Sequence, residues 1–273
     1  MEGQSGRLEM IFLEKYLKAR EEKDSVLCVG LDPAVKGQRK ENTIEADGSD
    51  SRGILEFCLE VVENVSEHCC AVKPNSQYLL FALEQKHLKK LNRSIHGQGL
   101  VSILDHKLSD IGSSNDSAVY WIGECGFDAF TYSPYPGNIA ETIKSAGESG
   151  LGVFTLCLMS NSEAKWIQKE TVFDKNPLFL QVAEIVAYAG GEGIVVGAAG
   201  SVTKDDVKVL RDTTGEDMIY LHPGIGAQGG DLEGIISLPG NVLVNVGRDI
   251  IYSEDASKKC GEYNLKINNI LKQ

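Results

Sequence analysis

The chain lacks a surplus of positive charge. Its 273 residues include 27 lysines and arginines against 39 aspartates and glutamates, which gives a formal net charge of −12. Binding to a nucleic-acid backbone or to an anionic membrane depends on a cationic field, and this composition does not supply one. The sequence therefore predicts neither a nucleic-acid partner nor a membrane partner. A small anionic ligand would need a local cationic pocket.

Long hydrophobic runs are also absent. No stretch approaches the ~18 apolar residues of a membrane span, and residues 1–7 are polar, without the apolar core of a signal peptide. The seven cysteines are scattered, odd in number and without the paired spacing of zinc sites. We interpret them as thiols in a reducing compartment, so we expect a cytoplasmic protein.

No low-complexity linker divides the chain. With 42% hydrophobic and 24% charged residues, the composition is that of a folded globular protein and excludes disorder, collagen and coiled coil. A single α/β barrel of ~250 residues lies within the range that this length allows. We expect residues 1–273 to form one domain.

Short β-branched runs alternate with stretches of helical period. The strands are predicted at residues 26–31, 70–74, 100–107, 128–133, 152–160, 193–198, 218–222 and 242–247. The helices are predicted at residues 54–65, 77–91, 115–125, 139–146, 178–188, 204–211 and 256–271. Apolar strands that are each separated by a helix form a parallel sheet, and eight such units close a barrel. We predict an α/β protein with a (β/α)8 TIM barrel; an open doubly wound sheet is the alternative.

A further helix is predicted before the first strand, at residues 8–23. It carries Leu8, Ile11, Phe12 and Tyr16 on one side, and we expect it to cap the bottom of the barrel. Two long polar connections, residues 36–51 and 161–176, follow the C-termini of strands. Barrels build their active sites at that end.

Charged residues stand at the ends of the predicted strands, namely Lys73, Asp105, Lys107 and, in the following loop, Asp110. Side chains alternate along a strand, so Asp105 and Lys107 point to one face, into the barrel mouth. Asp32 ends the first strand at the same height. Buried charges are costly unless they pair, so the array is either a structural network or a prepared electrostatic site. The convergence of four charges at the functional end favours the site.

His106 lies between two of these charges but has the opposite strand parity. We therefore interpret it as a packing or hydrogen-bonded histidine and not as a catalyst. Cys28 and Cys157 are interpreted in the same way, as small residues of buried strands.

A glycine-rich segment, residues 222–231, follows the seventh predicted strand, and the eighth ends in Val-Gly-Arg. Three of its glycines fit G-x-G-x-x-G, but a dinucleotide fold places that motif after the first strand. In a barrel the loops after strands seven and eight are the usual phosphate site. We therefore predict phosphate contacts by Gln228, Gly229 and Arg248; a tight turn with a surface arginine is the alternative.

Five motifs, in this order, resemble the orotidine 5′-phosphate decarboxylase family: Val-Gly-Leu-Asp-Pro, Ala-Val-Lys-Pro-Asn, Asp-x-Lys-x-x-Asp-Ile-Gly, Pro-Gly-Ile-Gly-Ala-Gln-Gly-Gly-Asp and Val-Gly-Arg. The resemblance extends from Cys28 to Ile251. It implies a homodimer of (β/α)8 barrels that converts orotidine monophosphate (OMP) into UMP and CO2 in de novo pyrimidine biosynthesis. It also implies that no metal or organic cofactor is used.

The resemblance implies catalytic roles for Lys73, Asp105, Lys107 and Asp110. The first three form the charged array at the pyrimidine, and Asp110 completes the array of the neighbouring subunit. Loss of CO2 from C6 leaves an electron pair on a carbon with little resonance relief, so a fixed cation beside C6 stabilises the transition state and then donates a proton. Lys107 is the candidate for both roles. The aspartates and Lys73 hold it charged and in place, and repulsion by Asp105 of the substrate carboxylate is a further, contested contribution.

The resemblance also implies a set of substrate contacts: Asp32, Ser114, Ser160, Gln228, Gly229 and Arg248. In this set Asp32 binds the ribose hydroxyls and Ser160 contacts the pyrimidine, while Gln228 and Arg248 bind the phosphate. Ser114 departs from the family, which usually has threonine there, and residues 108–109 replace the commoner Arg-Gly. The segment 36–51 resembles an extension. Segments 161–176 and 226–230 are candidate lids, whose closure would convert phosphate-binding energy into a lower barrier.

Two rival interpretations remain at this point. A sister group with the same Asp-x-Lys-x-x-Asp motif acts on sugar phosphates with Mg²⁺, but it carries a metal-binding glutamate where Lys73 stands, and a lysine there repels the ion. The chain could also be a catalytically silent nucleotide-binding barrel. The complete Lys/Asp/Lys/Asp set argues against a silent barrel, because a binding module needs no buried proton donor.

Overall fold

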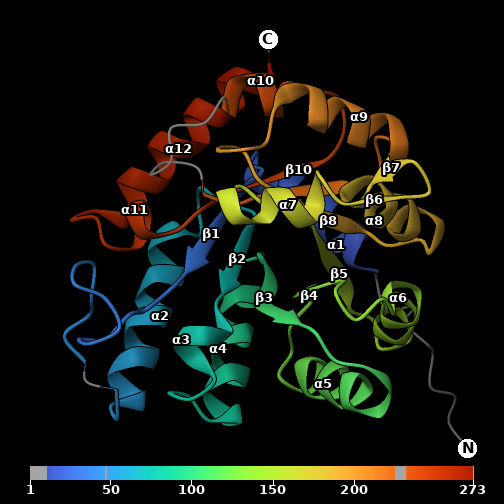
Figure 1. Ribbon diagram of the computed structural model, residues 1–273. Coiled ribbons are helices and arrows are strands. Elements are labelled where there is room, and N and C mark those ends of the chain that lie inside the picture. Colours follow the sequence, from blue (N-terminus) through green and yellow to red (C-terminus); the bar gives the residue numbers. More distant parts are fainter. Residues whose placement is uncertain (1–10, 47, 225–231, 273) are drawn as a thin grey trace, which may run out of the picture.

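Eight parallel strands form a closed barrel in the computed structural model, which describes residues 11–46, 48–224 and 232–272. The order around the barrel is β1-β10-β9-β8-β5-β4-β3-β2 (Figure 1). The barrel strands are β1 (Leu27–Leu31), β2 (Ala71–Pro74), β3 (Val101–Leu108), β4 (Ala129–Tyr132), β5 (Gly152–Leu158), β8 (Gly193–Val196), β9 (Ile219–His222) and β10 (Val242–Val246). Because β1 pairs with β10, the sheet has no open edge. The predicted barrel is confirmed, and the doubly wound alternative is wrong.

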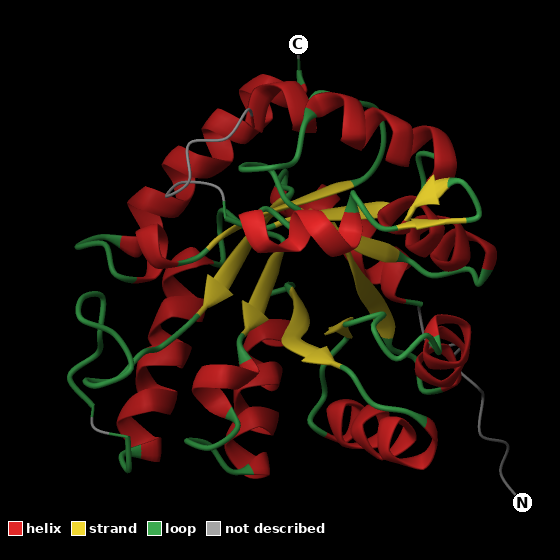
Figure 2. Cartoon of the chain, viewed as in Figure 1, coloured by secondary structure: helices red, strands yellow, loops and turns green. Residues whose placement is uncertain are grey.

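Helices surround the strands, as Figure 2 shows. The longer ones are α1 (Phe12–Lys23), α2 (Ser51–Val65), α4 (Gln85–Gly97), α5 (Gly112–Glu124), α6 (Ile139–Glu148), α8 (Leu178–Tyr188), α9 (Lys204–Thr214) and α12 (Ala256–Leu271). The short ones are α3 (Ser76–Leu79), α7 (Lys165–Gln168), α10 (Leu232–Ile236), α11 (Arg248–Ile251) and the 3₁₀ turn η1 (Ser162–Ala164). Across the described residues, no helix is both long enough and apolar enough to cross a membrane.

Apart from the mouth end of β3, the barrel strands are buried on both faces along most of their length, which explains their nearly continuous apolar sequences. On β10, Val242 and Val244 point outward into the cluster beneath the helices, while Leu243 points inward. The inward residues of the lower barrel form their own cluster with α1. This alternation continues to the C-terminal ends of the strands, so the inward-facing side chains there line the open mouth of the barrel.

Helix α1 caps the bottom of the barrel, as predicted. The rings of Phe12 and Phe154 meet edge to face at 5.4 Å, and the Tyr16 hydroxyl donates to the Val242 carbonyl at 2.7 Å. Ile11 was expected on the buried side of this helix, but its side chain is 55% exposed. That expectation is wrong because the helix begins at Phe12 and Ile11 is the residue that precedes it. Leu8 lies outside the described residues.

The single helix predicted for residues 77–91 is also wrong, because two helices, α3 and α4, occupy this region. A new helix begins after Glu84, whose side chain accepts the His87 N–H while His87 Nδ1 accepts the Glu84 N–H. Such a reciprocal capping box satisfies backbone donors at a helix start and fixes the break. The interruption leaves Phe81 fully exposed.

The two long connections both lie at the C-terminal end of the barrel. Residues 161–176 contain η1, α7 and, with Pro177, a small antiparallel sheet of β6 (Val172–Phe173) and β7 (Asn176–Pro177). Residues 32–50 form the other connection, between β1 and α2. In Figure 1 both segments lie on the side to which the strand arrows point.

Candidate functional site

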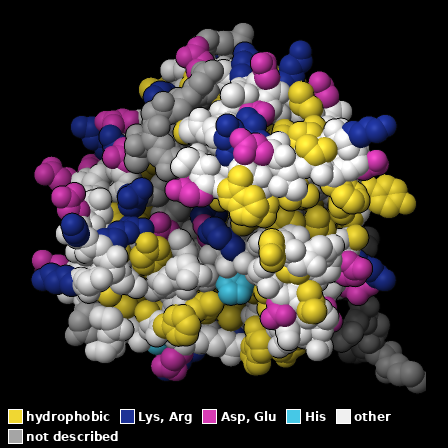
Figure 3. All heavy atoms as spheres, viewed as in Figure 1, with side chains coloured by type: hydrophobic (Ala, Val, Ile, Leu, Met, Phe, Trp, Pro, Cys, Tyr) yellow, Lys and Arg dark blue, Asp and Glu magenta, His cyan; other side chains and the backbone are white. Residues whose placement is uncertain are grey.

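A cavity of about 210 Å³ opens at the C-terminal mouth of the barrel. Its lining comes from the ends of β1, β2, β3 and β10 and from the segment after β9, namely Gly30, Asp32, Lys73, Asn75, Asp105, Pro223, Gly224, Asn245, Val246, Gly247, Arg248 and Asp249. Figure 3 shows Lys and Arg side chains near the centre of this face, beside α7. The chain thus provides the local cationic pocket that its overall charge does not.

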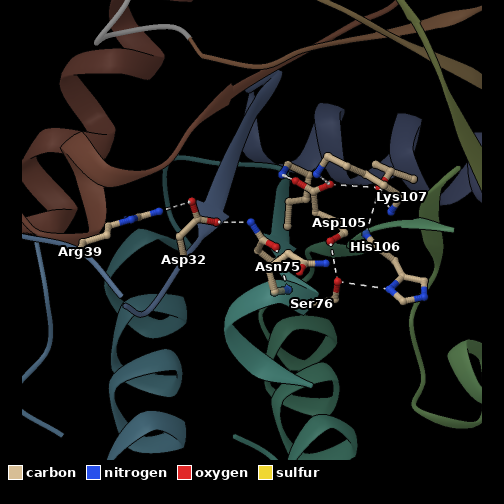
Figure 4. Close-up of polar contacts among 10 residues, drawn as sticks. Asp32, Arg39, Asn75, Ser76, Asp105, His106 and Lys107 are labelled. Carbon is tan, nitrogen blue, oxygen red and sulfur yellow. Dashed lines mark hydrogen bonds and ion pairs between the residues drawn. The ribbon is translucent and has the colours of Figure 1, made fainter. Parts of the chain in front are cut away.

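Asp105, which lines the cavity, lies between Lys73 and Lys107; Figure 4 shows it beside Lys107. Its Oδ2 forms an ion pair with Lys73, and its Oδ1 lies 2.6 Å from the Lys107 ammonium. The exposed side-chain fractions are 6% for Lys73, 13% for Asp105 and 43% for Lys107. The array is therefore anchored by a buried pair, while the second ammonium group remains accessible to a bound molecule.

The carboxylate and the ammonium groups of this array shift each other's pKa values. Burial alone would raise the pKa of Asp105, but the ammonium groups of Lys73 and Lys107 outweigh burial and hold that pKa well below its ordinary value. Burial would likewise lower the pKa of Lys73, but the Asp105 carboxylate reverses this, and the net shift is upward. Asp105 and Lys73 therefore stay ionised at neutral pH.

Strand β3 is irregular where it presents these groups. Its pairing with β4 shifts register between Leu104 and Leu108, and Lys107 has a φ of 55°, in the left-handed region. That conformation costs about 1–2 kcal/mol for a residue with a Cβ. The Thr131 hydroxyl accepts the N–H groups of His106 (3.0 Å) and Lys107 (2.9 Å) and donates to Asp105 Oδ1 (3.0 Å). One side chain of β4 thus holds the strained segment in place.

A second polar group forms around Asp32 at the end of β1. The Asp32 Oδ1 accepts a hydrogen bond from Asn75 Nδ2 at 3.0 Å, and Oδ2 lies 3.2 Å from a guanidinium nitrogen of Arg39. Asn75 also accepts the Gln77 N–H and so caps α3. Figure 4 shows Asp32 between Arg39 and Asn75.

His106 points away from this cavity. Its Nδ1 lies 3.2 Å from the Ser76 hydroxyl, which donates to the backbone carbonyl of Asp105 at 3.1 Å. Burial lowers the pKa of His106, so the ring is neutral at pH 7. The prediction of a packing and hydrogen-bonding role for this residue is confirmed.

Strand β10 places Arg248 at the rim of the cavity, at the start of α11 and exposed. The Asn245 side chain also faces the cavity, and its Oδ1 is buried without a partner among the described residues. Gln228 and Gly229, predicted to join Arg248, lie outside the described residues. The chain on either side of them, Pro223 and Gly224 before and α10 after, is described.

Four predicted residues that the structure describes are not among those that line the cavity: Lys107, whose ammonium group contacts the lining residue Asp105, and Asp110, Ser114 and Ser160. Asp110 lies in the loop after β3, exposed, with a carboxylate oxygen accepting the Ile111 N–H at 2.8 Å. Ser114 is exposed in the first turn of α5. Ser160 is half-buried after β5, with its backbone packed so closely against Gly200 that a Cβ there would lie 2.0 Å from the Ser160 carbonyl oxygen.

Three further residues, Asn75, Thr131 and Arg39, contact the charged groups although no role was predicted for them. Asn75 stands two residues after Lys73, so strand parity would have placed both on the inner face. Thr131 has the same parity as Ala129, an inward residue of β4, and could have been found in the same way. Arg39 belongs to a loop without periodicity, so no sequence pattern indicated it.

The arrangement holds two ammonium groups and a guanidinium in or beside the open cavity at the barrel mouth: Lys73 and Arg248 line it, and Lys107 contacts the lining residue Asp105. Such preorganised cations stabilise negative charge that develops on a bound molecule. Among the residues that the structure describes, no cluster of three or more histidine, cysteine or acidic side chains could hold a metal ion.

The family model, the related sequences and the similar solved structures all indicate the same family. The model of the Orotidine 5'-phosphate decarboxylase / HUMPS family matches residues 25–263. The orotidine 5'-phosphate decarboxylase of Thermomicrobium roseum is 35% identical over 266 residues, covering 93% of this chain and 90% of that protein. The enzyme of the same name from Herpetosiphon aurantiacus is 31% identical over 257 residues, or 90% of this chain and 91% of that protein. The solved structure of Leishmania donovani OMP decarboxylase has a TM-score of 0.80 at 25% identity and covers 97% of this chain and 100% of that chain.

Proposed function

Because the chain belongs to the orotidine 5′-phosphate decarboxylase / HUMPS family, we propose that it converts OMP into UMP and CO2, the last step of UMP biosynthesis. It is a carboxy-lyase. The observation that carries this proposal is the Lys73–Asp105–Lys107 array, with a partly exposed ammonium group 2.6 Å from a buried carboxylate at the cavity.

Lys107 supplies the chemistry at C6. The bond between C6 and the carboxylate carbon breaks, CO2 leaves, and the electron pair stays on C6. The Lys107 ammonium stabilises this pair as it develops and then transfers a proton to C6, which forms the C6–H bond of UMP. Because the lysine is already fixed by Asp105, little reorganisation is needed at the moment of reaction.

Asp105 and Lys73 position and charge Lys107. Asp105 accepts from both ammonium groups, so rotation of either lysine away from the cavity would leave a poorly solvated carboxylate without its partner. The Asp105 carboxylate also lies where it repels the substrate carboxylate, which favours departure of CO2. Its main contribution is nevertheless to hold Lys107 protonated and in place.

The remaining contacts bind the parts of OMP that do not react. Asp32 accepts the ribose hydroxyls, Ser160 contacts the pyrimidine, and Ser114 belongs to the same substrate-binding set. Gln228, Gly229 and Arg248 bind the phosphate. Phosphate contacts remote from C6 lower the barrier if they drive closure of loops, and segments 161–176 and 226–230 are the candidate lids.

The decisive experiment is conversion of OMP to UMP by the purified chain, with and without EDTA. We expect turnover that EDTA leaves unchanged, because the Lys73 ammonium occupies the position at which the Mg²⁺-dependent sugar-phosphate enzymes would hold their cation, and it repels one. Loss of activity on chelation, or turnover of a sugar phosphate in place of OMP, would favour the sister group. Tight binding of UMP without any turnover would indicate a silent nucleotide-binding barrel.

Arg248→Ala is expected to raise KM for OMP by about 100-fold, with a smaller change in kcat. The reason is the loss of a charge-assisted contact with the phosphate, of about 3 kcal/mol. Steady-state kinetics measure the split between the two constants. Arg93→Ala, at an exposed position of α4, is the matched control and should change neither. An unchanged KM in Arg248→Ala would place the phosphate elsewhere.

We also propose that the chain is a homodimer in which Asp110 enters the neighbouring site. Asp110 is exposed in the loop that also carries the exposed Ile111 (62%), and two further exposed apolar side chains, Phe81 (100%) and Tyr135 (82%), stand in the segments that follow β2 and β4. Figure 3 shows hydrophobic side chains at the surface over α3 to α5. Exposed apolar patches of this kind mark protein–protein interfaces.

Complementation between two inactive variants tests this sharing. Lys107→Ala and Asp110→Ala should each lose most activity, whereas co-refolding equal amounts should restore roughly a quarter of wild-type activity, because half the dimers are mixed and each has one intact site. Light scattering after size exclusion gives the oligomeric state. A monomer, or a mixture as inactive as its components, would contradict the shared site.

A cytoplasmic location is part of the same proposal. All seven cysteines are buried free thiols, and none is paired in a disulfide. Thiols in this state are typical of a reducing compartment. Fractionation of cells that express the tagged chain would test the location.

A further inference from the structure

Residues 32–46, in the connection between β1 and α2, fold back on themselves at the barrel rim. Ile44 donates its N–H to the Ala34 carbonyl at 2.8 Å, which closes the loop on itself. The Tyr252 hydroxyl accepts the Ala34 N–H at 2.8 Å and donates to the Asp32 carbonyl at 2.9 Å, which fixes its start. Ala34 and Ile44 are buried. The loop is therefore held against the barrel rim, and it carries Arg39 toward the cavity.

Arg39 reaches back from this loop to Asp32, the residue that follows β1. One guanidinium nitrogen lies 3.2 Å from Asp32 Oδ2 and also contacts the Tyr78 hydroxyl, while the guanidinium carbon lies 4.6 Å from the centre of the Tyr78 ring. A planar guanidinium that pairs with a carboxylate and stacks on an aromatic ring has little freedom to move. Figure 4 shows this side chain directed at Asp32 from the side opposite Asn75.

The pair differs from the surface ion pairs of the same chain. The side chains of Arg39 and Asp32 are 19% and 22% exposed, whereas those of Arg52 and Glu56, one helix turn apart on α2, are 87% and 59% exposed. Solvent screens the exposed pair strongly and the half-buried pair much less. The Arg39–Asp32 contact is therefore strong enough to hold a carboxylate in one orientation.

Both oxygens of Asp32 are consequently fixed, Oδ1 by Asn75 and Oδ2 by Arg39. A carboxylate has about four acceptor positions, so two remain for a ligand. Asp32 lines the cavity, where hydroxyl donors of a bound molecule can reach it. A preorganised acceptor discriminates between ligands with and without the matching hydroxyl far better than a mobile one does.

We propose that Arg39 is a positioning residue for sugar recognition: by holding Asp32, it makes the site select nucleotides that carry the full ribose diol. This rests on the proposed function, in which Asp32 accepts ribose hydroxyls. The loop of residues 32–50 thereby acquires a function in the site, although it contributes no group to the chemistry at C6.

Binding of UMP, 2′-deoxy-UMP and 3′-deoxy-UMP by calorimetry tests the proposal. The quantity of interest is the preference, the Kd of the deoxy analogue divided by the Kd of UMP, for the hydroxyl that the wild type recognises most strongly. Arg39→Met keeps the length and apolar stem of the side chain but removes its charge, and it should lower this preference by ~5-fold or more. Arg39→Lys should retain part of the preference, because an ammonium group pairs with Asp32 but lacks the planar fork.

Two further variants separate positioning from general destabilisation. Arg52→Met removes an exposed arginine of α2 and should leave the preference and the OMP turnover unchanged. Tyr78→Phe keeps the ring under Arg39 and removes only the hydroxyl contact, so its preference should lie between those of the wild type and Arg39→Met. A protein that is merely less stable has a lower Tm and a smaller bindable fraction, but its ratio of Kd values stays the same.

These experiments distinguish failure of the positioning role of Arg39 from failure of the proposed decarboxylase function. If the wild type turns over OMP and Arg39→Met keeps the full hydroxyl preference, Arg39 is only structural and the inference is wrong. If the wild type neither turns over OMP nor binds UMP, the proposed function fails and this inference fails with it. A preference that collapses in Arg39→Met while the Tm stays near that of Arg52→Met supports the positioning role.

Discussion

Lys107→Ala is expected to lower kcat for OMP decarboxylation by ~10⁴-fold or more. The substitution removes both the cation that stabilises the electron pair on C6 and the acid that protonates it, and these contribute ~10²–10³-fold and ~10²–10⁴-fold in comparable enzymes. The change in kcat should exceed the change in KM, because both interactions strengthen as charge develops on C6. Single-turnover kinetics with excess enzyme measure the chemical step directly.

The fold should survive this substitution. Lys107 is 43% exposed, and its φ of 55° is held by the hydrogen bonds from the backbone N–H groups of His106 and Lys107 to Thr131, which alanine keeps. The circular dichroism spectrum should therefore match that of the wild type, and Tm should fall only slightly, because Asp105 loses one ion pair but keeps its contact with Lys73. Lys208→Ala, an exposed lysine of α9, is the control for loss of one positive charge. Turnover near the wild-type rate in folded Lys107→Ala would remove the proposed mechanism.

Asp105→Asn is the second substitution with a large expected effect, and it acts on activity and stability together. It leaves the buried Lys73 ammonium without its counterion and Lys107 without its anchor, so kcat should fall by ~10²–10³-fold. Breaking a largely buried pair by removing one charge should lower the free energy of unfolding by about 3 kcal/mol. Denaturant titration and steady-state kinetics measure the two effects, with Asp212→Asn, exposed on α9, as the matched control.

The stability difference between the wild type and Asp105→Asn should depend on pH in one direction. Because the native pKa of Asp105 lies below its value in the unfolded chain, ~3.9, the wild type gains the full contribution above about pH 4 and loses it as pH falls through the native pKa. The difference should thus be constant between about pH 5 and 8 and shrink in acid. A difference that grows as the pH falls below 4 would mean that Asp105 is not held as a carboxylate by the lysines.

Much of the site could be predicted because strand alternation carries directional information. The spacing of Asp105 and Lys107 placed both on the inner face, and the structure joins them although the strand is irregular there. The same rule placed His106 outside the cavity. Phe12 and Tyr16 were assigned to the barrel bottom from one helical face, but Ile11 was not correctly assigned, because a helix start cannot be located to the residue from periodicity.

Strand alternation and helical periodicity could not predict the contacts that irregular segments make. Arg39 approaches Asp32 only because the loop between β1 and α2 folds back and is fixed by Tyr252, which lies 220 residues from Asp32 in the sequence. The break between α3 and α4 likewise depends on local hydrogen bonds: Glu84 and His87 form a capping box that starts a new helix at Gln85. Neither the Arg39–Asp32 contact nor this helix break can be predicted from the spacing of apolar residues.

The sequence by itself determined the alternation of parallel strands and helices and favoured the closed barrel, because apolar strands and amphipathic helices must bury their faces in alternating layers. It also indicated the end at which the charged residues gather, because they occur at strand termini. The structure decided that the sheet closes between β1 and β10. The tertiary structure decided how those charges are held. The left-handed conformation of Lys107 persists because Thr131 of a neighbouring strand accepts two backbone N–H groups, and Asp32 is fixed by Asn75 and Arg39 from separate elements. Such contacts join residues far apart in the chain, and their energies exist only once the barrel has brought them within hydrogen-bond distance.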